Sequence, residues 1–149
     1  MEAYRISLIK WTKKLTASGF PARWNSKGKF VIYTAGSRAL ACLENVVHRS
    51  GEGLNDKFKV MLIQIPDKIK IEEIRLDSLP EGWSKFENYS FTQKIGDNWL
   101  ENNQTAVLKV PSSIVNMESN YLLNPNHKDF KKIKLRGTEE FEFDSRIKK

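Results

Sequence analysis

The chain has 149 residues, the size of one compact domain, and 40% of them are hydrophobic, which is enough for one sizeable core. Its formal net charge of +7 favours anionic partners such as nucleotides, nucleic acid or acidic proteins. No apolar stretch approaches the roughly 20 residues that a membrane helix needs, and residues 1–5 lack the features of a signal peptide. We therefore expect a soluble, cytoplasmic protein with one domain over residues 1–149.

The single cysteine and two histidines restrict the chemistry that is available. A closed structural zinc site needs four nitrogen or sulfur ligands, so we expect no metal site of this kind. Cys42 and His48 point about 120° apart on a predicted helix, which argues against a Cys–His nucleophile pair there. Catalysis must then depend on carboxylates, hydroxyls, tyrosine and arginine.

In the first half of the chain, short strands alternate with helices. Apolar and β-branched runs predict strands over residues 2–8, 30–34, 58–65 and 70–76. A short helix is predicted over Trp11–Ala17, ending before Gly19. A second helix is predicted from Ser37, a good N-cap, to about His48, with Gly51 and Gly53 ending it.

The second half predicts one helix over residues 92–101, followed by short strands over 105–110, 121–123, 133–135 and 139–143. In the last of these strands, Phe141 and Phe143 alternate with acidic residues, so that one face is apolar and the other acidic. Because strands outnumber helices and are scattered along the chain, the fold class is predicted to be α+β.

The predicted helix after Ser37 carries a carboxylate at the edge of its apolar face. At 100° per residue, Glu44 falls about 40° beyond Leu40, and Ser37 and His48 project on the same side. The apolar stripe beside it comprises Ala39, Leu40, Leu43, Val46 and Val47. A half-desolvated carboxylate there suits an electrostatic or general-base role, whereas the more frequent interpretation is a surface Glu paired with Arg or Lys.

Two further residues near this helix admit a structural and a functional interpretation. The planar fork of Arg23 suits a phosphate or a carboxylate, or an ordinary surface ion pair. Tyr33 shares a strand face with Val31 and could form an aromatic floor for a planar ring, or pack in the core with its hydroxyl at the edge. Trp24 is assigned to the core.

Common nucleotide motifs are absent from the sequence. There is no G-x-G-x-x-G, and Ser26-Lys27-Gly28-Lys29 resembles a phosphate loop only superficially. A basic cluster surrounds Phe130 and could contact nucleic-acid phosphates; it comprises Lys128, Lys131, Lys132, Lys134 and Arg136. Because no aromatic RNA-binding motif accompanies this cluster, we interpret it as a solvated face and expect no direct nucleic-acid binding.

A series of short motifs runs through nearly the whole chain. They are Tyr4-Arg5-Ile6, Arg23-Trp24-Asn25 with Gly28, Tyr33-Thr34-Ala35, Ser37-Arg38-Ala39-Leu40-Ala41, Leu43-Glu44, Leu79-Pro80-Glu81-Gly82-Trp83, Gly96-Asp97-Asn98-Trp99-Leu100, the run 106–112, the run 120–125, and Phe141 with Phe143-Asp144. In order and spacing they resemble the RES-domain family, the toxins of bacterial RES–Xre type II toxin–antitoxin pairs.

The resemblance implies an ADP-ribosyltransferase-like α+β fold, a mixed sheet with flanking helices, that takes NAD as a substrate and needs no cofactor. It implies a toxin that halts growth by cleaving the nicotinamide–ribose bond, through hydrolysis or phosphorolysis. Transfer of ADP-ribose to a protein is the first alternative, and a basic nucleic-acid-binding module is the second. An Xre-like antitoxin is the implied partner, and a homodimer is compatible with the family.

The family's Arg, Tyr and Glu correspond to Arg23, Tyr33 and Glu44, and its Ser after the Val-Pro pair corresponds to Ser112. By this resemblance Glu44 stabilises the positive charge that develops on the ribose, as carboxylates do in glycoside hydrolysis. Tyr33 stacks on nicotinamide, Arg23 anchors a phosphate of NAD, and Ser112 hydrogen-bonds the nicotinamide or the ribose. The expected NAD-binding set is completed by Asn25 and Ser37.

Overall fold

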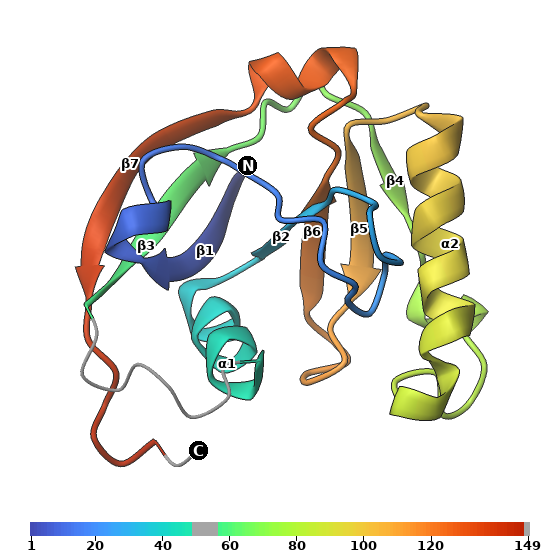
Figure 1. The fold of residues 1–149 in the computed structure, drawn as a ribbon, viewed down its shortest axis with the longest axis horizontal. Coiled ribbons are helices and arrows are strands. Elements are labelled where there is room, and N and C mark those ends of the chain that lie inside the picture. The colour runs from blue at the N-terminus through green and yellow to red at the C-terminus, as the bar shows by residue number, and fades with distance from the viewer. Residues whose placement is uncertain (49–56, 148–149) are drawn as a thin grey trace.

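The computed structural model describes residues 1–48 and 57–147. Within them, seven strands form one mixed sheet in the order β4-β5-β6-β2-β1-β3-β7 (Figure 1). Every neighbouring pair is antiparallel except β4 and β5, which are parallel. The strands are β1 (Glu2–Leu8), β2 (Ile32–Ala35), β3 (Phe58–Gln64), β4 (Ile71–Glu73), β5 (Val107–Pro111), β6 (Ser119–Leu123) and β7 (Lys134–Phe141).

Two α-helices flank this sheet in the described residues, which confirms the α+β class (Figure 1). Helix α1 (Arg38–His48) packs against β1 and β2, and α2 (Tyr89–Asn102) runs beside the β4–β5 end of the sheet. The short 3-10 turns are η1 (Ile9–Trp11), η2 (Leu76–Ser78), η3 (Phe86–Asn88) and η4 (Lys128–Lys132). No helix in the described part of the chain is long and apolar enough to cross a membrane.

A tryptophan-rich part of the core joins α2 to the sheet. Trp24, Trp83 and Trp99 are buried there with Leu108 and other side chains of the central strands. Helix α2 approaches closely because residue 96 is glycine: a Cβ at Gly96 would lie 1.6 Å from the Trp24 carbonyl oxygen. The absence of a side chain at this position therefore allows the helix to contact the backbone of the segment that carries Arg23.

The structure contradicts the helix predicted over Trp11–Ala17. A single 3-10 turn, η1, ends at Trp11, and residues 12–17 have no regular helix. Leu15 and Ala17 pack against the buried core of the sheet as the chain crosses it. A seven-residue helix is marginal by itself, so these tertiary contacts determine the conformation.

The two short strands predicted over 133–135 and 139–143 are a single strand, β7. Its pairing with β3 continues past Gly137 through a register shift between Leu62 and Ile63. Continuous pairing with a neighbour outweighs the local weakness of a glycine. Phe143 lies beyond the strand, where its ring packs edge-on against Phe58 at 5.0 Å.

Candidate active site

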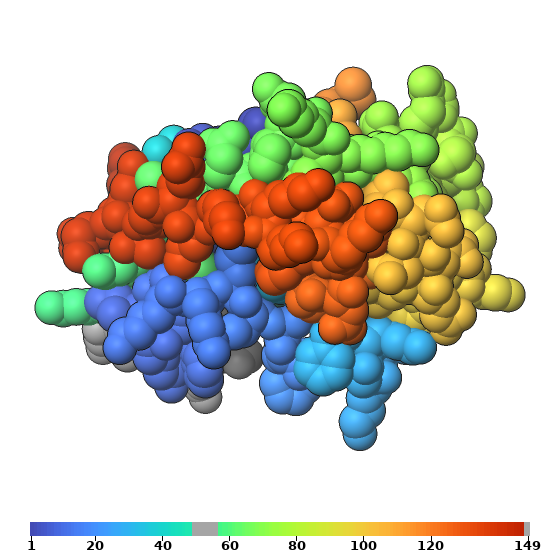
Figure 2. Space-filling view, turned by 90° about the horizontal axis from the view of Figure 1, so that it is seen from above, coloured from blue at the N-terminus to red at the C-terminus, as the bar shows by residue number. Residues whose placement is uncertain are grey.

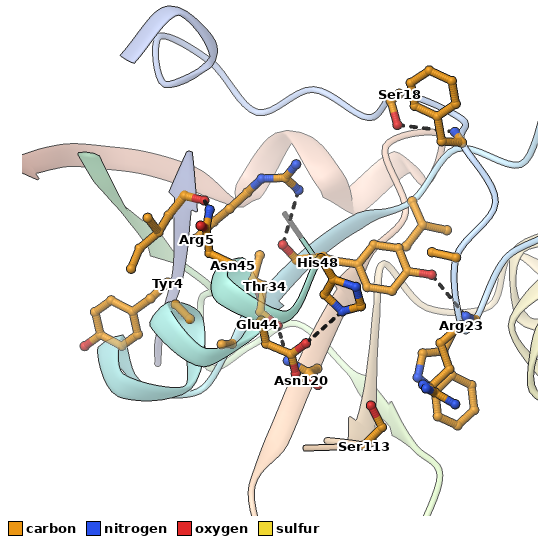
Figure 3. A pocket seen from close by; sticks show the side chains of 18 of the residues that line it. Tyr4, Arg5, Ser18, Arg23, Thr34, Glu44, Asn45, His48, Ser113 and Asn120 are labelled. Atoms are coloured by element: carbon orange, nitrogen blue, oxygen red, sulfur yellow. Dashed lines mark hydrogen bonds and ion pairs between the residues drawn. The ribbon is translucent and has the colours of Figure 1, made fainter. Parts of the chain in front are cut away.

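A cavity of about 530 Å³ opens between α1, strands β1 and β2 and the loop that leads to Trp24 (Figure 3). Arg23, Tyr33 and Glu44, separated by up to 21 positions in the chain, all line it. Cavities of roughly 300–1,000 Å³ are typical of small-molecule and cofactor sites. The structure thus brings together the three residues predicted to form the centre of the site.

Glu44 lies on α1 and is held at both carboxylate oxygens. Ser112 Oγ donates to Oε1 at 3.2 Å. His48 Nε2 lies 3.2 Å from Oε2 (Figure 3). The Glu44 side chain keeps 20% of its surface exposed. The carboxylate is therefore both oriented and accessible from the cavity, which is what an electrostatic role toward a ligand requires.

Ser112 is fully buried behind Glu44. Its hydroxyl oxygen accepts hydrogen bonds from the backbone N–H groups of Ile114 and Val115, at 3.0 and 3.1 Å. Since a hydroxyl has one proton, these two bonds direct that proton toward Glu44. Ser112 therefore orients the Glu44 carboxylate.

Tyr33 lies at the end of a buried hydrogen-bond chain. Its hydroxyl donates to Asn25 Oδ1 at 2.5 Å and accepts from the Trp24 N–H at 3.1 Å. Burial raises the pKa of the Tyr33 phenol far above its ordinary value, so the hydroxyl stays protonated. Because the hydroxyl already donates and accepts hydrogen bonds within the protein, the ring is the part of Tyr33 that can contact a ligand in the cavity.

Asn25 is buried and braces the loop around the cavity. Its amide nitrogen donates to the carbonyls of Phe20 (2.8 Å) and Lys29 (2.9 Å), while its amide oxygen accepts from Tyr33. These bonds, with a further one to the Ser26 carbonyl at 3.3 Å, all go to protein groups, which places Asn25 behind Tyr33. This buried network locks the loop residues in place.

Arg23 is positioned from α2. Thr92 Oγ1 donates to its carbonyl at 2.6 Å, and its guanidinium lies 4.7 Å from the centre of the Tyr89 ring. Its Nη1 is buried without a hydrogen-bond partner among the described residues. A buried donor without an acceptor is costly, and an anionic oxygen of a ligand would satisfy it.

Ser37, the last of the predicted site residues, caps α1. Its hydroxyl accepts from the Leu40 N–H at 3.1 Å and donates to Glu118 Oε1 at 3.3 Å. The side chain does not line the cavity. Its contribution is to fix the start of the helix that carries Glu44.

The apolar stripe predicted on α1 is not buried as a whole. Leu43 and Val47 are 41% and 59% exposed, whereas Leu40 and Ala41 are buried. Asn45 on the inner face donates to the carbonyl of Ile6 at 3.1 Å. The packing rotates the helix so that its polar residues face the cavity, because those residues have partners on β1 and after β5.

Arg5 is a site residue that the pattern analysis did not single out. It reaches the cavity from β1, and its Nη1 donates to the Tyr33 carbonyl at 3.2 Å (Figure 3). Burial lowers the pKa of its guanidinium, which nonetheless remains charged. The signal available in the sequence was an arginine flanked by Tyr4 and Ile6 in the middle of a strand.

The cavity has an excess of positive charge. Among the described residues, neither Arg5 nor Arg23 forms an ion pair, and the carboxylate in the wall, Glu44, lies against His48 and Ser112. Burying a cation without a counter-ion is unfavourable. The site is therefore suited to a ligand with a negatively charged part, and Glu44 suits a centre of positive charge on the same ligand.

The basic cluster around Phe130 lies apart from this cavity. Figure 2 shows η4 at the surface of the molecule. All five basic residues of the cluster are exposed, none of them lines the cavity, and Lys132 pairs with Asp129 at 3.0 Å. In residues 1–48 and 57–147, no group of three or more His, Cys, Asp and Glu side chains is arranged to hold a metal ion.

Comparison with known proteins relates this chain to bacterial toxins. The model of the RES domain family matches residues 2–144. A Prs ADP-ribosylating toxin from Sphingobium sp. (strain YBL2) is 39% identical over 127 residues, covering 84% of this chain and 79% of that protein. Toxin Res of Photorhabdus laumondii subsp. laumondii is 34% identical over 154 residues, covering 100% of this chain and 98% of that protein.

A solved structure shares the fold. The toxin–antitoxin complex MbcT–MbcA of M. tuberculosis contains a chain that superimposes with a TM-score of 0.75 at 15% identity. The match covers 95% of this chain and 84% of the other. At this identity the likeness concerns the arrangement of the sheet and its helices.

Proposed function

This chain belongs to the RES domain family, and from that membership we propose that it is the toxin of a toxin–antitoxin pair and cleaves the nicotinamide–ribose bond of NAD. The observation that carries the proposal is the fixed Glu44 carboxylate in a cavity with two arginines that have no carboxylate partner in the described residues. NAD matches this arrangement, since it combines a pyrophosphate with a cationic nicotinamide ring.

In the proposed reaction the bond between the ribose carbon and the ring nitrogen breaks, and its electron pair stays on nicotinamide. The ring nitrogen is cationic in NAD, so nicotinamide leaves as a neutral molecule and needs no general acid. Positive charge develops on the ribose, and Glu44 stabilises it by its negative charge. Ser112 keeps the carboxylate in position throughout.

The other cavity residues bind and orient the substrate. Tyr33 presents its ring to nicotinamide while its hydroxyl remains bonded to Asn25. The unpartnered Nη1 of Arg23 donates to a phosphate oxygen. Water, phosphate or a protein side chain then attacks the ribose carbon and forms the new bond to it.

Transfer to a protein is a second candidate because the relative from Sphingobium, 39% identical, is named an ADP-ribosylating toxin. Both reactions use the same first step and differ in the acceptor. NAD labelled in the adenylate half, incubated with the protein and a cell lysate, separates them. A labelled protein band supports transfer, and free labelled ADP-ribose or its phosphate ester supports hydrolysis or phosphorolysis.

We further propose an antitoxin of the Xre-like type as the partner, supported by the toxin–antitoxin complex that shares this fold. A cationic cavity in a protein of net charge +7 would accept an acidic or carboxylate-ending segment. Full access of NAD to the cavity in the complex would contradict this mode of inhibition.

The deciding experiment measures nicotinamide released from NAD by the purified protein, with and without phosphate. Glu44→Gln is expected to lose about 10²–10³-fold in rate, the usual effect of removing one such electrostatic contact. Glu72→Gln, at an exposed position on the distant strand β4, is the matched control. Absence of nicotinamide release by the folded wild-type protein, in either buffer and with lysate, would refute NAD cleavage.

A further inference from the structure

Phe20 is an aromatic side chain in the wall of the cavity whose ring is left open. The side chain is 77% exposed and lines the cavity. A single exposed apolar side chain elsewhere on a surface needs no explanation, but one in the wall of a cavity can contact a ligand. The other aromatic side chains in the cavity wall have other roles: Trp24 is 2% exposed, Arg38 lies 4.7 Å from the Tyr4 ring, and the Tyr33 ring is the one proposed for nicotinamide. Phe20 is therefore available to a ligand.

The backbone that carries Phe20 is fixed on both sides. Its N–H donates to Ser18 Oγ at 3.2 Å and its carbonyl accepts from the buried Asn25 amide at 2.8 Å. Gly19 before it has a φ of +75°, and a Cβ there would lie 2.9 Å from the Phe30 ring. The loop thus fixes the backbone from which the exposed ring projects, which reduces the backbone entropy lost when a ligand binds.

The position of the loop relative to Glu44 indicates which part of a ligand Phe20 meets. In Figure 3, Ser18 and Glu44 lie at opposite sides of the cavity. On the proposed function, nicotinamide is at Glu44, so the second ring of the dinucleotide must lie elsewhere along the cavity. The two ends are joined by a pyrophosphate, for which Arg5 and Arg23 provide the cations.

We propose that Phe20 is the stacking platform for the adenine ring of NAD. Every purine base presents a π face, and stacking on an aromatic side chain is a strong, geometrically tolerant contact. The residue binds the half of the substrate that does not react. It therefore acts on substrate affinity and on the choice of dinucleotides over mononucleotides.

The test compares NAD with nicotinamide mononucleotide, which has the same reacting bond but no adenylate half. Phe20→Ala is expected to raise KM for NAD roughly tenfold, within the range that loss of one base stack produces, with little change in kcat. Cleavage of the mononucleotide should be unchanged, and Phe20→Trp should restore KM for NAD. Phe91→Ala, a 44% exposed position outside the cavity, is the control.

Three results would overturn the proposal. The first is an unchanged KM for NAD in Phe20→Ala. The second is an equal loss of cleavage for NAD and for the mononucleotide, which would mean that Phe20 maintains the shape of the loop. The variant could also cleave NAD normally but escape an antitoxin, which would make Phe20 a protein contact.

Direct binding separates this proposal from the proposed function. If wild type releases no nicotinamide from NAD, the proposed reaction fails, and ADP still tests the platform by titration calorimetry. Roughly tenfold weaker ADP binding by Phe20→Ala would support the adenine platform. Equal binding of ADP by the two proteins would refute it.

Discussion

The Ser112 hydroxyl donates to the Glu44 carboxylate at 3.2 Å, across 68 residues of chain. Ser112 follows strand β5, and Glu44 lies on the helix that follows β2. Two backbone N–H groups fix the serine oxygen. The carboxylate therefore has its orientation before any ligand arrives, so that little reorganisation is needed during the reaction.

Ser112→Ala should lower kcat for nicotinamide release roughly tenfold and leave KM for NAD nearly unchanged. The variant removes the donor to Glu44 and also the acceptor for Ile114 and Val115 N–H, so its free energy of unfolding should fall by about 1–3 kcal/mol. Kinetics and urea unfolding together check both effects. A variant as active as wild type would show that Glu44 does not need this contact.

Arg5→Gln should raise KM for NAD roughly tenfold or more because the cavity loses a cation that has no carboxylate partner in the described residues. Arg136→Gln, the matched charge removal at an exposed position outside the cavity, should behave as wild type. Steady-state kinetics at fixed ionic strength make the comparison. Equal effects in the two variants would mean that net charge alone is responsible.

Gly96→Ala should destabilise the protein and weaken NAD binding. The added Cβ would lie 1.6 Å from the Trp24 carbonyl oxygen, so α2 must move away from the segment that it holds through Thr92 and Arg23. Gly137→Ala, where a Cβ meets nothing within 4 Å, is the control. Thermal unfolding and KM for NAD check the pair, and a Gly96→Ala protein as stable as the control would contradict the prediction.

Tyr33 should make stability depend on pH in the alkaline range. Burial raises the pKa of its phenol in the folded state, whereas the unfolded chain loses this proton near pH 10, the ordinary value. The unfolded state then binds fewer protons, so the contribution of Tyr33 to stability is complete below about pH 10 and is lost as pH rises above it.

The measurement is the free energy of unfolding of wild type and Tyr33→Phe between pH 8 and pH 11. The difference between the two proteins should be constant up to about pH 10 and shrink above it, by at most about 1.4 kcal/mol per pH unit. Comparing the two cancels the titration of lysines and of the other tyrosines. Parallel curves over the whole range would contradict the buried, protonated phenol.

Local sequence patterns were sufficient for the fold class and for most of the elements. Apolar and β-branched runs predicted the strands that became β1, β2 and β3, and the Ser37 cap marked the start of α1. These signals are local because they arise from side chains a few residues apart. Motif order also selected Arg23, Tyr33 and Glu44, and all three line one cavity.

The tertiary structure decided what surrounds those three residues. It rotated α1 so that Glu44 and Asn45 face inward and Leu43 outward, and it placed Ser112 behind the carboxylate. It also brought Arg5 into the cavity wall. Each of these features depends on contacts between segments far apart in the chain. A pattern that repeats every two or 3.6 residues reports only on neighbouring residues and contains no information about such contacts. Arg23, Tyr33 and Glu44 are thus readable in the sequence, whereas their orientation and the charge balance of the cavity arise only when the sheet and its helices pack together.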